Sequence, residues 1–93
     1  MKVTVVKIEL FMRESQTLKD KRRVIKSLIE RVKNRYNVSI AEVDDNDSCK
    51  KSTIGIAILS NDTKFNDKQL KEIINFIDSN PFVMIIKSEM EIW

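Results

Sequence analysis

Hydrophobic and polar residues follow four strand-like patterns and two helix-like patterns along the chain. Residues 3–12 are apolar at every even position from Val6 to Met12 and mixed at the odd positions, and this period of two predicts a strand. Residues 38–43 and 53–59 also favour strands, and the polar cluster between them predicts that they form a hairpin. The stretch from residue 82 to residue 93 predicts a last strand.

Apolar residues at helical spacing mark the remaining two segments. The first predicted helix covers residues 18–36, with Thr17 as its N-cap. Its apolar sector comprises Leu18, Ile25, Leu28, Ile29, Val32 and Tyr36. The second helix is predicted to have Asn66 as its N-cap and to stop at Asn80 and Pro81.

The element order β, α, β, β, α, β is that of the ferredoxin-like plait. We therefore expect residues 1–93 to form one α+β domain with two layers. Right-handed crossovers put both helices on one face of a four-stranded antiparallel sheet, with the first and third strands in the centre. The opposite face of the sheet is expected to be bare.

The first and last strands are expected to be antiparallel neighbours. A register that places Lys7 opposite Glu89 also places Glu9 opposite Lys87, so that two pairs of opposite charge lie on one face. A slip of one residue would lose both matches.

The bare face of the sheet carries an apolar patch in this register, with Phe11 beside Ile85 and Val3 beside Trp93. The predicted patch comprises Val3, Val5, Phe11, Leu59, Val83, Ile85 and Trp93. Because monomers rarely expose a large contiguous apolar surface, we expect a homodimer through this face. The alternative is that Lys and Glu side chains shield the patch.

Composition argues against catalysis. The chain has no histidine, so the commonest general base and metal ligand is missing, and its one glycine excludes a glycine-rich phosphate loop. Acylphosphatases share this size and fold, but their glycine-rich anion loop is absent. The acidic turn with Asp44, Asp45 and Asp47 lacks the pattern of a calcium loop. Neither a catalytic residue nor a metal or cofactor is expected.

The cellular compartment is expected to be the cytoplasm. Cys49 is the single cysteine, which fits a reducing compartment, and Lys7 and Glu9 interrupt the apolar stretch that an export signal needs. No window approaches the roughly 18 consecutive apolar residues of a membrane span.

Positive charge is concentrated in the first third of the chain. The net charge is +3, but residues 1–35 carry 11 basic and 4 acidic side chains, a net of +7. On the first predicted helix, Lys19, Arg22, Arg23, Lys26 and Lys33 share a face away from the apolar sector. This face predicts binding to nucleic-acid phosphates, the alternative being a merely solvated helix.

Lys21 differs from the other basic residues because it falls within the apolar sector of the helix. A lysine there must either extend its ammonium group to solvent or find a carboxylate partner, and the end of the second strand offers Glu42 or Asp44. A structural ion pair is therefore predicted.

The third strand offers no aromatic side chain to stack on bases, so any RNA is expected to bind the helix and not the sheet.

The segment from Ser15 to Asp44, together with the Ser-Asn-Asp at residues 60–62, resembles the YlxP-like family of small bacterial proteins. The resemblance covers essentially the whole chain and implies a ferredoxin-like fold without an established activity. The family's gene often lies near genes for transcription elongation, translation initiation factor 2 and ribosome-binding factor A, which implies ribosome assembly or RNA by association. The family's hairpin loop usually carries histidine and tryptophan, where this chain has Asp45 and Cys49.

Two functions follow from these observations. The first is a non-enzymatic, RNA- or ribosome-associated accessory protein that uses the basic helix. The second is a homo-oligomeric protein-interaction module in which the helix charge serves only solubility.

Overall fold

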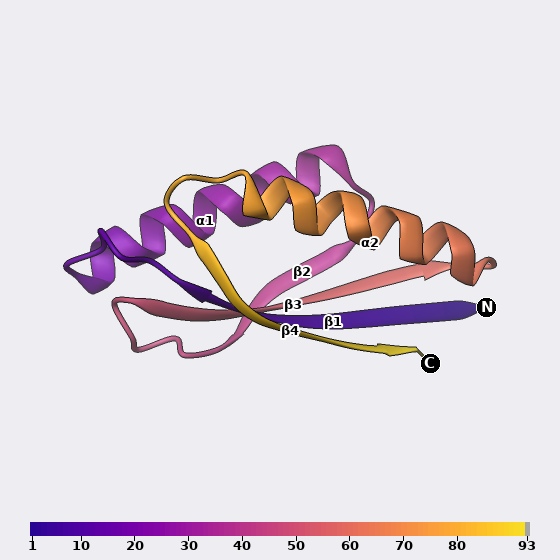
Figure 1. The fold of residues 1–93 in the computed structure, drawn as a ribbon, viewed down its shortest axis with the longest axis horizontal. Coiled ribbons are helices and arrows are strands. Elements are labelled where there is room, and N and C mark those ends of the chain that lie inside the picture. The colour runs from indigo at the N-terminus through magenta and orange to yellow at the C-terminus, as the bar shows by residue number, and fades with distance from the viewer. Residues whose placement is uncertain (93) are drawn as a thin grey trace.

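The order of helices and strands matches the sequence expectation. The computed structural model describes residues 1–92, and its elements are β1 (Lys2–Phe11), α1 (Leu18–Arg35), β2 (Ser39–Asp44), β3 (Lys51–Ser60), α2 (Thr63–Asp78) and β4 (Met84–Ile92). The strands form one antiparallel sheet in the order β2-β3-β1-β4, and both helices lie on the same side of it (Figure 1). The ferredoxin-like α+β fold is thereby confirmed.

The core lies between the helices and the sheet. Because alternate residues of a strand point to opposite faces, the even positions of the two central strands supply one wall of the core. The buried aliphatic side chains include Val6, Ile8 and Leu10 from β1, Ile40 from β2, Ile54, Ile56 and Ile58 from β3, Ile25, Leu28 and Val32 from α1, and Leu70, Ile73 and Ile77 from α2. Full burial of each such side chain stabilises the fold by roughly 1.5–3 kcal/mol.

Neither helix within residues 1–92 is long and apolar enough to cross a membrane.

The N-terminus of α1 is capped as predicted. The Thr17 side chain accepts a hydrogen bond from the backbone N–H of Asp20 at 3.1 Å. This bond satisfies one of the amides that the first helical turn leaves without a partner.

The N-terminus of α2 lies earlier than predicted, and Asn66 is not its cap. Asp62 caps the helix by accepting from the N–H of Lys64 at 2.9 Å. Asn66 is fully buried instead, and its side-chain amide donates to the carbonyls of Lys2 and Ile58 at 3.3 and 3.4 Å. The sequence prediction was wrong because the strand ends, and not the helix start, supply the partners of this asparagine.

The register of β1 and β4 matches the prediction over most of its length. Lys7 lies opposite Glu89 and Glu9 lies opposite Lys87, as expected.

A β-bulge then shifts the pairing between β1 and β4. It places Leu10 opposite Ile85 and Phe11 opposite Met84, so the predicted pair of Phe11 and Ile85 is wrong. One extra residue in a strand turns the following side chains to the other face.

The bulge also corrects the predicted apolar patch on the bare face. Ile85 packs against the core on the helix side, and Val83 is buried there. Neither residue belongs to the open face, while Trp93 lies outside the described residues.

Lys21 joins α1 to the end of β2 through a buried ion pair, as predicted. Its ammonium group is fully buried and donates to the carboxylate of Glu42 at 2.7 Å. It also donates to three backbone carbonyls of the hairpin, those of Asp45 at 2.9 Å and of Asn46 and Lys51 at 3.3 Å. A buried charge is tolerated only when it is paired and hydrogen-bonded in this way.

We expect Lys21→Met to lower the free energy of unfolding by about 3–5 kcal/mol, because it leaves the Glu42 carboxylate without a cation and three carbonyls without a donor. Denaturant titration followed by circular dichroism measures the change. Lys19→Met, at an exposed position of the same helix, is the matched control and should stay within about 0.5 kcal/mol of the native protein. Equal unfolding midpoints for the two variants would show that the pair contributes nothing.

Candidate nucleic-acid interface

The outer face of α1 carries the basic side chains that the sequence singled out. The helix turns its buried residues, Lys21, Ile25, Leu28 and Val32, toward the sheet. The residues predicted to bind nucleic acid are all exposed: Lys19, Arg22, Arg23, Lys26 and Lys33. We call these five residues the basic face.

The charge of the basic face is not neutralised by neighbouring acids. Within residues 1–92, the ion pairs shorter than 4.0 Å are those of Lys21 with Glu42 and of Lys87 with Glu89. Neither pair involves the basic face, although Glu30 lies on the same helix and is also exposed. The positive potential of the helix therefore stays available to an external anion.

The C-terminal end of α1 is held by an aromatic contact. The Arg35 guanidinium lies 4.7 Å from the centre of the Phe76 ring on α2, a cation–π geometry. The Tyr36 ring packs edge-on against the same phenyl ring, with the ring centres 6.3 Å apart. Arg35 thus ties the two helices together.

A groove of about 410 Å³ runs beside the basic face, between α1 and β2. Ile25 and Ile29 contribute apolar surface to it. The charged residues that line it are Arg22, Lys26, Glu30, Lys33 and Glu42. Three of the five residues of the basic face therefore border a concave surface. Sequence reasoning missed the groove, because it depends on how closely the helix approaches the strand.

The hairpin between β2 and β3 is a hydrogen-bonded turn. The Asp45 carboxylate accepts from the Thr53 hydroxyl at 2.8 Å, and Asp45 itself has the left-handed φ of 59° that asparagine and aspartate tolerate. The neighbouring Lys50 ammonium donates to the carbonyls of Arg13 and Ser15 at 3.0 and 2.8 Å. Among residues 1–92, no three cysteine or carboxylate side chains gather in a metal-binding arrangement.

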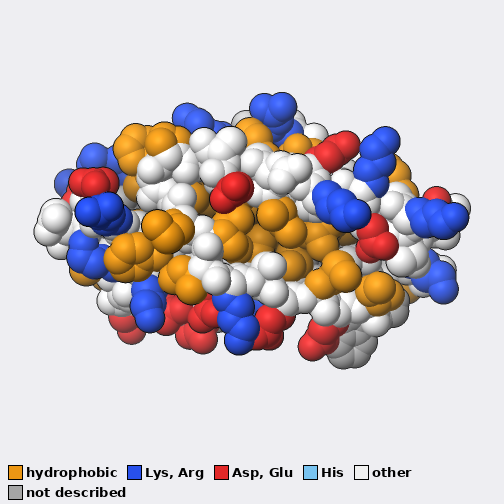
Figure 2. Space-filling model, viewed as in Figure 1, with side chains coloured by type: hydrophobic (Ala, Val, Ile, Leu, Met, Phe, Trp, Pro, Cys, Tyr) orange, Lys and Arg blue, Asp and Glu red, His pale blue; other side chains and the backbone are white. Residues whose placement is uncertain are grey.

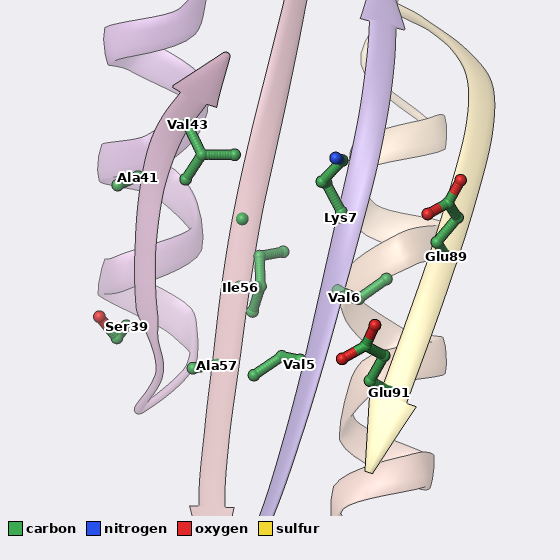
Figure 3. A pocket seen from close by; sticks show the side chains of 11 residues that line it. Val5, Val6, Lys7, Ser39, Ala41, Val43, Ile56, Ala57, Glu89 and Glu91 are labelled. Carbon is green, nitrogen blue, oxygen red and sulfur yellow. The ribbon is translucent and has the colours of Figure 1, made fainter. Parts of the chain in front are cut away.

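The open face of the sheet contains a shallow hollow of about 450 Å³ (Figure 3). Gly55 shapes its floor, because a Cβ atom there would lie 2.9 Å from a methyl group of Val43 on the adjacent strand. Small side chains from β2 and β3 and the side chain of Val5 line the hollow, and Lys7 and Glu91 border it. The hollow therefore has an apolar floor that charged side chains border.

Four residues of the predicted apolar patch do lie on this open face. Val3, Val5 and Phe11 are half-buried, while Leu59 is 62% exposed and pairs with Val3. The patch is therefore narrower than the sequence implied.

On β4, the open face of the sheet carries charged side chains. The Lys87 ammonium donates to the Glu89 carboxylate at 2.7 Å. That hydrogen bond, reinforced by the attraction of the opposite charges, raises the pKa of Lys87 and lowers the pKa of Glu89. Both side chains are well exposed, so solvent screens the pair and its effect on stability is small.

A solved structure with a similar fold is the de novo designed protein Foldit4. It superimposes with a TM-score of 0.56 over 100% of this chain and 97% of that protein, at 19% sequence identity. This likeness bears on the fold alone.

Two comparisons bear on the family. The chain is 37% identical over 73 residues to the uncharacterized protein YlxP of Bacillus subtilis (strain 168), which covers 78% of this chain and 79% of that protein. The model of a family described as "Protein of unknown function (DUF503)" matches residues 3–90. With nearly the whole length matched, and with the fold that the sequence resemblance implied, the chain belongs to the DUF503 family, which includes YlxP-like proteins.

Proposed function

We propose that the protein is a non-enzymatic accessory protein that binds RNA phosphates through the basic face of α1. The observation that carries this proposal is that all five side chains of the basic face are exposed and none takes part in an ion pair within residues 1–92. Such a surface attracts polyanions with little sequence preference. Association with the ribosome or with structured RNA is the context that we propose for it.

The helix is a better candidate than the sheet for contact with RNA. Sheets of this fold that recognise single-stranded RNA stack bases on aromatic side chains of the central strands. Here the open-face positions of β3 are Lys51, Thr53, Gly55, Ala57 and Leu59, and Phe11 lies at the end of β1. The described central strands therefore lack a stacking platform of aromatic side chains, whereas the helix supplies charge beside a groove.

We expect the double substitution Arg23→Glu with Lys26→Glu to weaken RNA binding by about tenfold or more, because it removes two phosphate contacts and introduces repulsion. Fluorescence anisotropy with a labelled ribosomal RNA fragment at low salt measures the affinity. The matched control is Lys68→Glu with Lys71→Glu, two exposed positions of α2 that change the net charge equally. Equal losses in the two double variants would contradict a site on α1.

The salt dependence of binding tests how many phosphates are contacted. If Lys19, Arg23, Lys26 and Lys33 each neutralise one phosphate, the logarithm of the affinity should fall with the logarithm of salt concentration at a slope of about −3 to −4 per copy. The same anisotropy titration, repeated from low to moderate salt, gives this slope. A slope near zero would rule out phosphate contacts as the source of binding.

A homo-oligomeric interaction module is the second candidate function. The observation in its favour is the open sheet face, where Leu59 is 62% exposed next to the half-buried Val3 and Val5. Exposed apolar surface of this kind is common at interfaces between subunits.

Under this second function, Val5→Lys should convert a dimer into a monomer, because a charge would be buried at the centre of the contact. Light scattering at tens of micromolar protein measures the mass. The variant Asn75→Lys, at an exposed position of α2, adds the same charge away from the open face and should leave the mass unchanged. A native protein that is already monomeric at this concentration would exclude the second function.

A further inference from the structure

Strand β4 is an exposed edge of the sheet with an unusual pattern of side chains. It pairs with β1 on one side, and within residues 1–92 no strand pairs with its other side. An edge of this kind presents free N–H and C=O groups to another strand. On the open face its side chains include Lys87, Glu89 and Glu91.

The helix side of the same strand carries hydrophobic residues that α2 does not cover. Met90 lies opposite the core residue Val6, yet it is 50% exposed, and Ile92, opposite Thr4, is 54% exposed. In the view of Figure 2, hydrophobic side chains gather in a band below α2 along this strand. The strand therefore has an edge that no described strand covers and exposed apolar surface beside that edge.

We propose that a second copy of the chain pairs with this edge, β4 against β4 in antiparallel orientation, with Ser88 of the two copies opposite each other. The two sheets then form one continuous sheet with all helices on the same side. In this register Lys87 lies opposite Glu89 of the second copy. One register thus matches opposite charges on the open face.

The charges select this register over its neighbours. Two antiparallel copies of β4 keep their side chains on matching faces only if the two paired residue numbers add up to an even total. The two alternative registers nearest to the proposed one place Lys87 opposite Lys87 or Glu89 opposite Glu89. Since Lys7 lies opposite Glu89 and Glu9 opposite Lys87 within each chain, the proposed register continues the alternation across both sheets. Each row reads, in order, Lys7, Glu89, the second copy's Lys87 and the second copy's Glu9.

Charges on an edge strand usually protect it from pairing. The protection works when like charges face each other or when a charge points into the partner's core. Here Lys87 and Glu89 lie two residues apart on one face and have opposite signs, so a second copy of the same strand complements them. The β-bulge between Ile85 and Lys87 interrupts the regular strand, so the proposed pairing is confined to the segment around Ser88.

Two charge-reversal variants test the pairing. Lys87→Glu alone places negative charges opposite each other, and Glu89→Lys alone places positive charges opposite each other, so each variant should raise the dimer dissociation constant by about tenfold or more. A mixture of the two variants restores opposite charges and should form a 1:1 heterodimer. Sedimentation velocity at tens of micromolar measures all three samples, with circular dichroism to confirm that each variant is folded.

A cysteine placed at the twofold axis tests the register. Opposed Cα atoms in an antiparallel pair are about 4.5–5.5 Å apart, within the range of a disulfide. In a Cys49→Ser background, Ser88→Cys should form a disulfide-linked dimer under mild oxidation. Met90→Cys, two residues away on the same face, should not.

Either of two results would overturn the proposal. One is a native protein that sediments as a monomer and a Ser88→Cys variant that does not cross-link. The other is a native dimer that Val5→Lys dissociates while both charge-reversal variants leave it intact, which would place the contact on the open face of the sheet.

Discussion

The buried ammonium group of Lys21 is the interaction on which the arrangement of this molecule depends. It lies inside the apolar sector of α1, and the carboxylate of Glu42 and three hairpin carbonyls surround it. These bonds join the start of the helix to the end of β2 and to the loop that follows. Because a lone buried charge costs several kcal/mol, the helix cannot rotate about its axis without breaking the whole set. The orientation that the set imposes turns the basic face away from the sheet.

The same constraint explains why charge and concavity occur together on α1. With the helix fixed against the end of β2, Arg22 and Lys26 border the groove beside that strand. The side chains that neutralise one another are Lys21 with Glu42, which also lines the groove, and Lys87 with Glu89, and neither pair includes a residue of the basic face. The structural charges are thus paired, and the charges of the basic face remain free for a polyanion. This separation supports the proposed role of α1 in binding phosphate.

The sequence predicts those features that depend on residue spacing. Helical periodicity places Lys26 outside and Lys21 inside, and the topology brings Lys21 to the end of β2, so an ion pair with Glu42 or Asp44 follows from pattern, and the structure shows Glu42 as the partner. Residue spacing does not predict features that depend on one extra residue in a strand or on partners from distant parts of the chain. The bulge in β4 turns Ile85 to the core, although alternation favours the open face. Asn66 resembles a helix cap in sequence, but the carbonyls that it binds belong to the strands.

The most direct test of the account is to observe which backbone amides respond when RNA is added to the ¹⁵N-labelled protein. The account predicts that chemical-shift changes in an NMR titration concentrate in α1 between Lys19 and Lys33 and along the adjoining groove, and that α2 and the open face of the sheet stay unchanged. Shifts centred on the open-face residues of β1 and β3, or no shifts at low salt, would contradict the proposal that the basic face of α1 binds RNA.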